Sequence, residues 1–221
     1  GVVRLRSLVA NAVAGANCPV PRTYFTHYYK RFLQFMNEPA ITSNDIVMLG
    51  NSLTEGGGDW GKRLGKDNVI NRGISGDVAM GIYDRLHQIL PGKPKKIFLL
   101  IGVNDISHDL STDSIVQMIE KNVTRIQRES PETKLYLQSL LPIDESFNRY
   151  KKLTNKTYQI PEINDRLKAL AKEKKIDFID LYPLFTEKGT NVLRKELTYD
   201  GLHLKEEGYK IWVDAIKKKM K

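Results

Sequence analysis

The feature that most constrains the fold is a series of short apolar runs that alternate with helix-type stretches. The runs are Ile46–Leu49, Val69–Ile70, Lys96–Ile101, Lys134–Leu140 and Ile176–Leu181. The helical patterns cover Trp60–Leu64, Val78–Leu90, Ser114–Arg128, Ile160–Lys174 and Lys205–Lys219. Such alternation predicts a parallel sheet with helices on both faces, and continuous apolar runs are typical of strands buried on both sides. We therefore expect an α/β fold, a three-layer α/β/α sandwich of about five parallel strands.

An aromatic segment, residues 22–37, precedes these runs. Its apolar residues are spaced as in an amphipathic helix that packs on the domain. The chain has 221 residues, 41% of them hydrophobic, with no repeat or low-complexity linker, which suits one domain with a substantial core. We expect residues 1–40 to form an N-terminal arm with this helix, and residues 41–221 to form the domain.

Residues 1–18 admit several interpretations. Arg4 and Arg6 precede an apolar stretch, residues 8–16, as in the remains of an export signal. An artefact of expression or an ordinary arm fits equally, so location stays open, with a periplasmic or secreted protein favoured over a cytoplasmic one. The single cysteine, Cys18, excludes an internal disulfide and a Cys-rich metal site. No apolar run approaches the ~18 residues that a membrane span needs, so no span is expected.

The net charge of +9 raises the question of nucleic acid. The lysines are scattered, and the densest group, Lys217–Lys219 with Lys221, suits the last turn of a helix. No basic stripe is interleaved with aromatic residues for base stacking. We expect no nucleic-acid partner.

Residues 56–62 fit the G-x-x-x-x-G-K pattern of a phosphate-binding loop. Such a loop needs a Ser or Thr after the lysine as a magnesium ligand, and Arg63 stands there instead. Asp59 would also place a negative charge inside the phosphate cradle. The alternative is a glycine-rich linker in which Trp60 anchors the next helix.

A second pattern concerns the carboxyl ends of the expected strands, where parallel sheets bind their ligands. Ser52 follows the first run, and a later Asp200-x-x-His203 could reach the same edge. A serine hydroxyl becomes a nucleophile when a histidine takes its proton and a carboxylate orients that histidine. One tight turn brings Asp200 and His203 to the same side. The sequence thus predicts Ser52 as nucleophile, His203 as base and Asp200 as its orienting acid.

The other three histidines are weaker candidates. His27 lies in the aromatic segment, where a packed or surface role is expected, and His87 is expected to be exposed on a helix. His108 follows the third run and could contact a substrate near the edge of the sheet.

Acyl transfer also needs donors for the negative charge that develops on the carbonyl oxygen. The backbone N–H of Ser52 opens a turn or helix, where such groups point outward. Gly76, after the second run, allows close backbone approach, and Asn104, after the third, offers an uncharged NH₂ donor. We expect an oxyanion hole formed by Ser52, Gly76 and Asn104.

Together these residues resemble the SGNH hydrolases, or GDSL lipase/esterase family. The matching blocks are residues 46–53, 71–77, 102–105 and 200–204, in the family's order. The resemblance implies a flavodoxin-like sandwich and neither a metal nor an organic cofactor. One departure is Asn51, which replaces the aspartate of the name-giving block but can make similar turn hydrogen bonds. The aromatic arm and the blocks look most like the branch related to platelet-activating-factor acetylhydrolase, with its bacterial acylhydrolases and carbohydrate acetylesterases.

The expected activity is therefore serine ester hydrolysis of a small-molecule substrate. We expect removal of a short acyl group, acetyl above all, from a carbohydrate or similar alcohol. Residues 144–158 carry aromatic and basic side chains that could cover a sugar or an anionic substrate: Phe147, Arg149, Tyr150, Lys152 and Tyr158. A lysophospholipase or thioesterase of the same family is the alternative, and a non-catalytic or nucleotide-binding module is a distant one. The natural substrate and the oligomeric state stay open.

Overall fold

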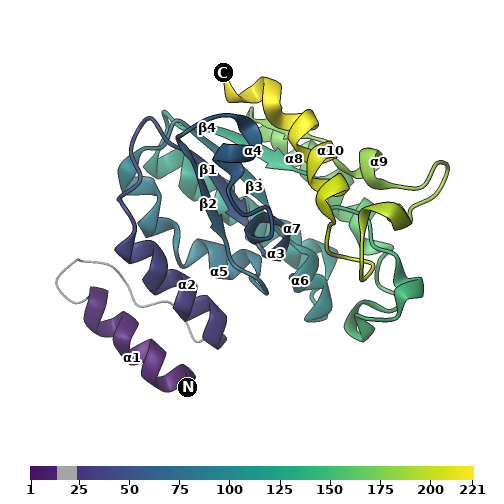
Figure 1. Cartoon of the computed structure of the whole chain (residues 1–221), viewed down its shortest axis with the longest axis horizontal. Coiled ribbons are helices and arrows are strands. Elements are labelled where there is room, and N and C mark those ends of the chain that lie inside the picture. Colours follow the sequence, from purple (N-terminus) through teal and green to yellow (C-terminus); the bar gives the residue numbers. More distant parts are fainter. Residues whose placement is uncertain (14–23) are drawn as a thin grey trace.

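A five-stranded parallel sheet forms the centre of the molecule in the computed structural model, which describes residues 1–13 and 24–221 (Figure 1). The strand order is β2-β1-β3-β4-β5, and every neighbouring pair is parallel. The strands are β1 (Ile46–Gly50), β2 (Val69–Gly73), β3 (Lys96–Leu100), β4 (Lys134–Gln138) and β5 (Asp177–Ile179). The predicted α/β/α sandwich with five parallel strands is confirmed.

Helices cover both faces of the sheet. On one face lie α3 (Ser52–Glu55), α4 (Trp60–Leu64) and α10 (Glu206–Ile216), where the Trp60 and Trp212 rings meet with centroids 4.9 Å apart. On the other, α7 (Thr112–Glu129) packs between α5 (Ala79–Tyr83) and α8 (Gln159–Lys174). Two short helices, α6 (Val103–Ser107) and α9 (Tyr182–Phe185), follow β3 and β5. Single 3₁₀ turns span Leu86–Gln88, Leu90–Gly92, Glu145–Phe147, Lys151–Leu153, Lys195–Leu197 and Lys217–Met220.

The strand register places several loops at one edge. All residues of β1 and β3 are buried, as their continuous apolar sequences predict. Gly50, the last residue of β1, lies opposite Gly73 of β2 and Leu100 of β3. The segments that follow these three strands therefore leave the sheet side by side.

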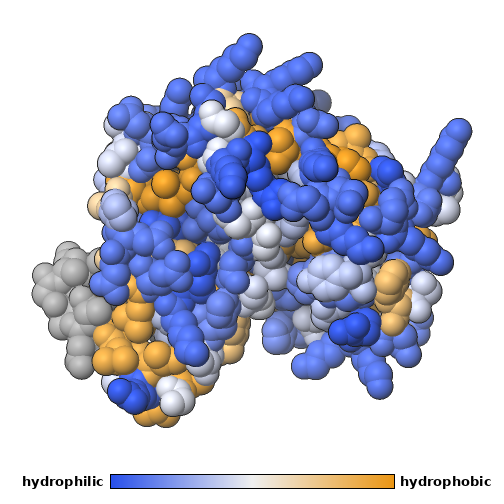
Figure 2. Space-filling view, viewed as in Figure 1, coloured by the Kyte–Doolittle hydropathy of each residue, from blue (hydrophilic) through white to orange (hydrophobic). Residues whose placement is uncertain are grey.

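The aromatic segment forms α2 (Thr26–Asn37), which packs beside β2 and α5, with α1 (Val2–Val13) against it (Figure 1). Tyr28 is buried and its hydroxyl donates to the Gly81 carbonyl at 2.7 Å, while Gln88 donates to the Phe32 carbonyl. The first two residues of the predicted helix lie outside the described residues. Apolar side chains gather on the surface over α1 and α2, at the lower left of Figure 2. Across the described ranges, no helix combines the length and the apolar character needed to cross a bilayer.

The predicted helix Val78–Leu90 is wrong in its extent. It ends at Tyr83 and continues as 3₁₀ turns, and the guanidinium of Arg85 enters the protein interior to bind two backbone carbonyls. His87 is also not exposed as predicted. It is half-buried against the Phe32 ring, and this burial lowers its pKa.

Candidate active site

Ser52 is the first residue of α3 and follows β1 after a single intervening residue. A side chain at Gly50 would come within 2.3 Å of Thr54 Oγ1 and 2.5 Å of the Leu100 carbonyl, so only glycine fits at the strand end. Asn51 caps the helix, because its side chain accepts a hydrogen bond from the Leu53 N–H at 3.0 Å. This is the turn bond expected of an asparagine there, and it holds Ser52 at the carboxyl edge of the sheet.

Ser52, His203 and Asp200 form a hydrogen-bonded chain. His203 Nε2 lies 2.9 Å from Ser52 Oγ, and His203 Nδ1 lies 2.7 Å from Asp200 Oδ2. The other Asp200 oxygen accepts the backbone N–H groups of Leu202 and His203 at 2.9 and 2.7 Å. Burial opposes ionisation of Asp200, but hydrogen bonds from Tyr150, His203 and the backbone outweigh it and lower the pKa of Asp200 to about 2. The carboxylate is thus ionised at neutral pH.

Three potential donors face the same cavity, which has a volume of about 710 Å³ and is lined by Ser52, Gly76, Asn104 and His203 among others. Gly76 has a φ of +88°, and a side chain there would meet the Phe25 ring. Within the described residues, the N–H groups of Ser52 and Gly76 have no hydrogen-bond acceptor. Asn104 Nδ2 donates one hydrogen to the Asp77 carbonyl at 2.9 Å, which leaves its second hydrogen for a ligand. The surface is hollowed between the α2 side and the loop at the lower right of Figure 2.

Tyr150 contacts both Asp200 and His203, which the sequence did not predict. Its hydroxyl donates to Asp200 Oδ2 at 2.6 Å and lies 2.9 Å from His203 Nδ1. Burial and the neighbouring Asp200 carboxylate raise the pKa of the Tyr150 phenol, which therefore stays protonated. The sequence indicated only that Tyr150 belongs to a segment whose aromatic and basic side chains could cover a substrate. Nothing in its spacing pointed to Asp200.

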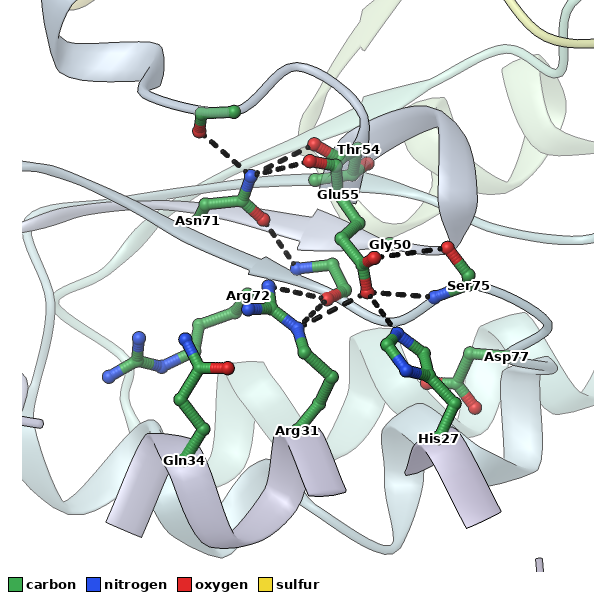
Figure 3. Close-up of polar contacts among 12 residues, drawn as sticks. His27, Arg31, Gln34, Gly50, Thr54, Glu55, Asn71, Arg72, Ser75 and Asp77 are labelled. Carbon is green, nitrogen blue, oxygen red and sulfur yellow. Dashed lines mark hydrogen bonds and ion pairs between the residues drawn. The ribbon is translucent and has the colours of Figure 1, made fainter. Parts of the chain in front are cut away.

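Glu55, the last residue of α3, ties the N-terminal helix to the site. Its carboxylate contacts His27 Nε2 at 2.8 Å and Arg31 Nε at 3.2 Å from α2, and accepts both the N–H and the hydroxyl of Ser75 at 3.2 Å (Figure 3). Burial opposes ionisation, but these donors prevail and lower the pKa of Glu55. Glu55 thus links the helix of Ser52 to the loop of Gly76, and His27 has a structural role.

A buried ion pair lies beneath the same loop. Arg85 Nη2 lies 2.9 Å from Asp77 Oδ2, and both side chains are fully buried. Arg85 also donates to the carbonyls of Arg72, in β2, at 2.9 Å and of Gly50, in β1, at 3.1 Å. The Asp77 carbonyl accepts a hydrogen bond from Asn104. Arg85 therefore connects the ends of β1 and β2 with Asp77 and, through Asp77, with Asn104.

The phosphate-loop interpretation of residues 56–62 finds no support. Gly56 is the C-cap of α3, and Asp59 caps the start of α4 by accepting the Lys62 N–H at 2.9 Å. Trp60 is fully buried and donates to the Thr54 carbonyl, so it anchors α4 as the linker interpretation expects.

His108 is exposed and lines a neighbouring cavity rather than the one at Ser52. Among the residues with described positions, no group of three or more His, Cys, Asp or Glu could hold a metal ion.

Comparisons with known proteins place this geometry in context. A curated relative, N-acylneuraminate cytidylyltransferase from Escherichia coli O18:K1:H7, is 26% identical over 177 residues, or 78% of this chain. The match covers 39% of that relative, so the chain spans about two fifths of its length. A GDSL-like lipase from Bacteroides thetaiotaomicron has a similar fold, with a TM-score of 0.77, 24% identity, and coverage of 89% of this chain and 98% of its own. A protein from Streptococcus pneumonia described as a platelet activating factor has a TM-score of 0.76 and 24% identity over the full length of both chains.

An acetyl xylan esterase also shares the fold, with a TM-score of 0.65, 22% identity, and coverage of 79% of this chain and 98% of its own. The sequence model of the GDSL-like lipase/acylhydrolase family matches residues 48–211, which include the strand ends and every side chain of the hydrogen-bonded chain. The protein therefore belongs to the GDSL-like lipase/acylhydrolase family.

Proposed function

We propose that this protein removes a short acyl group, acetyl above all, from a carbohydrate or similar alcohol through an acyl-enzyme on Ser52. The observation that carries the proposal is the chain Asp200–His203–Ser52, which ends in a cavity bordered by the N–H groups of Gly76 and Asn104. A hydroxyl, an imidazole and a carboxylate in this order are what nucleophilic acyl transfer requires.

In the first half of the reaction, Ser52 Oγ attacks the ester carbonyl while His203 Nε2 takes its proton. Asp200 keeps the Nδ1–H of the imidazole oriented and stabilises the imidazolium that forms. The N–H groups of Ser52 and Gly76 and the Asn104 amide donate to the oxyanion, and each such donor contributes about 3–4 kcal/mol to the barrier reduction. His203 then gives its proton to the leaving alcohol, and the acyl group stays on Ser52.

In the second half, water takes the place of the alcohol. His203 accepts a proton from the water as it attacks the acyl-enzyme, and returns a proton to Ser52 Oγ when the carboxylic acid leaves.

The lining of the cavity supports a small acyl group and a polar alcohol. Besides Ser52 it presents the small residues Ser75, Gly76 and Ser107, together with the Asn104 amide. The acetyl xylan esterase that shares the fold, and the relative named for an acylneuraminate, both act by name on carbohydrates. These names agree with a sugar as the alcohol. The following series tests the acyl half of the substrate.

Rates on 4-nitrophenyl acetate, butyrate and octanoate separate short-chain from lipase-type activity. We expect kcat/KM to be highest for acetate. A second cavity of about 710 Å³, lined by Phe25, Val78, Met80 and Met118, adjoins Gly76, so a preference for octanoate would favour the lysophospholipase or thioesterase alternative. Absence of cleavage of all three esters would contradict the proposed function.

Tyr150→Phe is expected to lower kcat by less than about tenfold at pH 8 and by more at pH 5. Without the Tyr150 hydroxyl, Asp200 Oδ2 loses a donor that favours its ionised form. The pKa of Asp200 therefore rises from about 2 towards its usual range. The profile of kcat between pH 5 and 9 measures both losses.

The matched control is Tyr158→Phe, which removes a hydroxyl from a 62% exposed tyrosine of the same segment. Its profile should coincide with that of the wild type. A Tyr150→Phe profile that also coincides with it would show that the hydroxyl does not act on the Asp200–His203 pair.

A further inference from the structure

The cavity that contains Ser52 is lined by three basic residues that lie close together in the chain: Arg149, Lys151 and Lys152. We call them the rim cations. They lie on the segment that also carries Tyr150, between β4 and α8, and all three side chains are exposed. Among the described residues, the lining includes no aspartate or glutamate. An ester that enters the cavity therefore meets positively charged side chains and no carboxylate among these lining residues.

The rim cations are not used for holding the fold together. In the part of the chain that the structure describes, none of them forms an ion pair with a carboxylate, whereas exposed basic residues elsewhere, such as Arg166 and Lys217, do. The nearby carboxylates are engaged with other groups, since Asp109 pairs with Lys156 and Glu145 accepts the Asn155 N–H. Lys152 and Asp109 interact only at longer range. The rim cations are thus available to a ligand.

Their position indicates which half of the ester they would contact. Tyr150, between Arg149 and Lys151 in the chain, has its hydroxyl 2.9 Å from His203 Nδ1. The segment that carries the rim cations therefore lies on the side of His203, the group that gives a proton to the leaving alcohol in the proposed reaction. The proposed oxyanion donors Gly76 and Asn104 come from other loops, after β2 and β3.

We propose, on the basis of the function proposed above, that the alcohol half of the substrate is anionic and that Arg149 and Lys152 bind its negative group. The chemical class is an acyl ester of an alcohol that carries a carboxylate or a similar anion, such as an O-acetylated sugar acid. Open cations at a cavity mouth raise the local concentration of such a substrate and stabilise its bound state. Each is expected to contribute about a fivefold factor at low ionic strength, the size of a solvent-exposed contact.

The test compares 4-acetoxybenzoate, whose leaving group carries a carboxylate, with its uncharged methyl ester. After correction for the hydroxide-catalysed rates, we expect kcat/KM of the wild type to be about tenfold or more higher for the charged ester at 20 mM salt. The preference should fall towards unity at about 0.5 M salt, where the screening length is a few ångström. Cleavage of the uncharged ester tests the proposed function independently of this preference.

Arg149→Ala/Lys152→Ala should lower kcat/KM for the charged ester about tenfold and change that for the methyl ester less than twofold. Lys188→Ala is the control, because Lys188 is exposed and does not line the cavity; its two rates should match those of the wild type. Calorimetric titration of the Ser52→Ala protein with both esters measures the same preference without turnover.

Equal rates on the two esters, or an equal loss on both in the double variant, would overturn the inference and leave the proposed function standing. Failure to cleave either ester would overturn the proposed function. The calorimetric preference for 4-acetoxybenzoate would then decide whether the rim cations bind anions.

Discussion

Replacing Ser52 with alanine is expected to lower kcat/KM for 4-nitrophenyl acetate about a thousandfold or more. The Ser52 hydroxyl is the only hydroxyl bonded to His203 Nε2 in the described part of the chain, at 2.9 Å. Without it His203 can only activate water, which lacks the fixed position that makes the attack intramolecular. The donors of the proposed oxyanion hole remain, so a residual rate above the uncatalysed reaction should persist.

Ser107→Ala is the matched control, since it removes one hydroxyl from the lining of the same cavity. Ser107 donates to the Asn104 carbonyl at 2.7 Å and does not contact His203, so its loss should lower the rate by less than about tenfold. Equal thermal unfolding temperatures of the three proteins would show that the folds are intact. A Ser52→Ala enzyme with wild-type rates would show that Ser52 is only a turn residue.

The position of the candidate site follows from the sequence because a parallel sheet brings its carboxyl ends together. Ser52, Gly76 and Asn104 lie far apart in the chain, but each follows a recognisable apolar run, and the register of β1, β2 and β3 aligns those runs. The tight turn of Asp200 and His203 is local, so its geometry is readable from a spacing of three residues. These features rest on backbone rules that every parallel sheet shares.

The parts that the sequence could not predict depend on long side chains that reach across the fold. Tyr150 meets Asp200 over a separation of 50 residues, and Glu55 meets His27 over 28. Arg85 was expected on a regular helix, where a charged residue normally faces solvent. Its burial depends on carbonyls at the ends of two strands, and no local pattern records them.

The largest expected effect on stability comes from this arginine. Arg85→Met should lower the free energy of unfolding by about 3–5 kcal/mol, the usual cost of removing one partner from a buried ion pair. The substitution leaves the Asp77 carboxylate without its cation and removes the hydrogen bonds that Arg85 donates to the carbonyls of Gly50 and Arg72, all in a buried position. Urea unfolding at pH 8 measures the loss. Arg166→Met, which breaks an exposed pair with Asp113, should cost less than about 1 kcal/mol.

The pH dependence of the loss identifies its cause. Burial raises the pKa of Asp77 to about 6 even though Arg85 lowers it, and without Arg85 that pKa rises further. A buried acid whose folded pKa lies above its unfolded value costs stability as the pH rises through that window. The deficit of Arg85→Met should therefore be smaller at pH 5, where Asp77 is protonated, than at pH 8. Adding Asp77→Asn removes the charge and should restore more than about 1 kcal/mol at pH 8. A deficit that is independent of pH and is not relieved by Asp77→Asn would mean that lost packing, rather than the unpaired carboxylate, dominates.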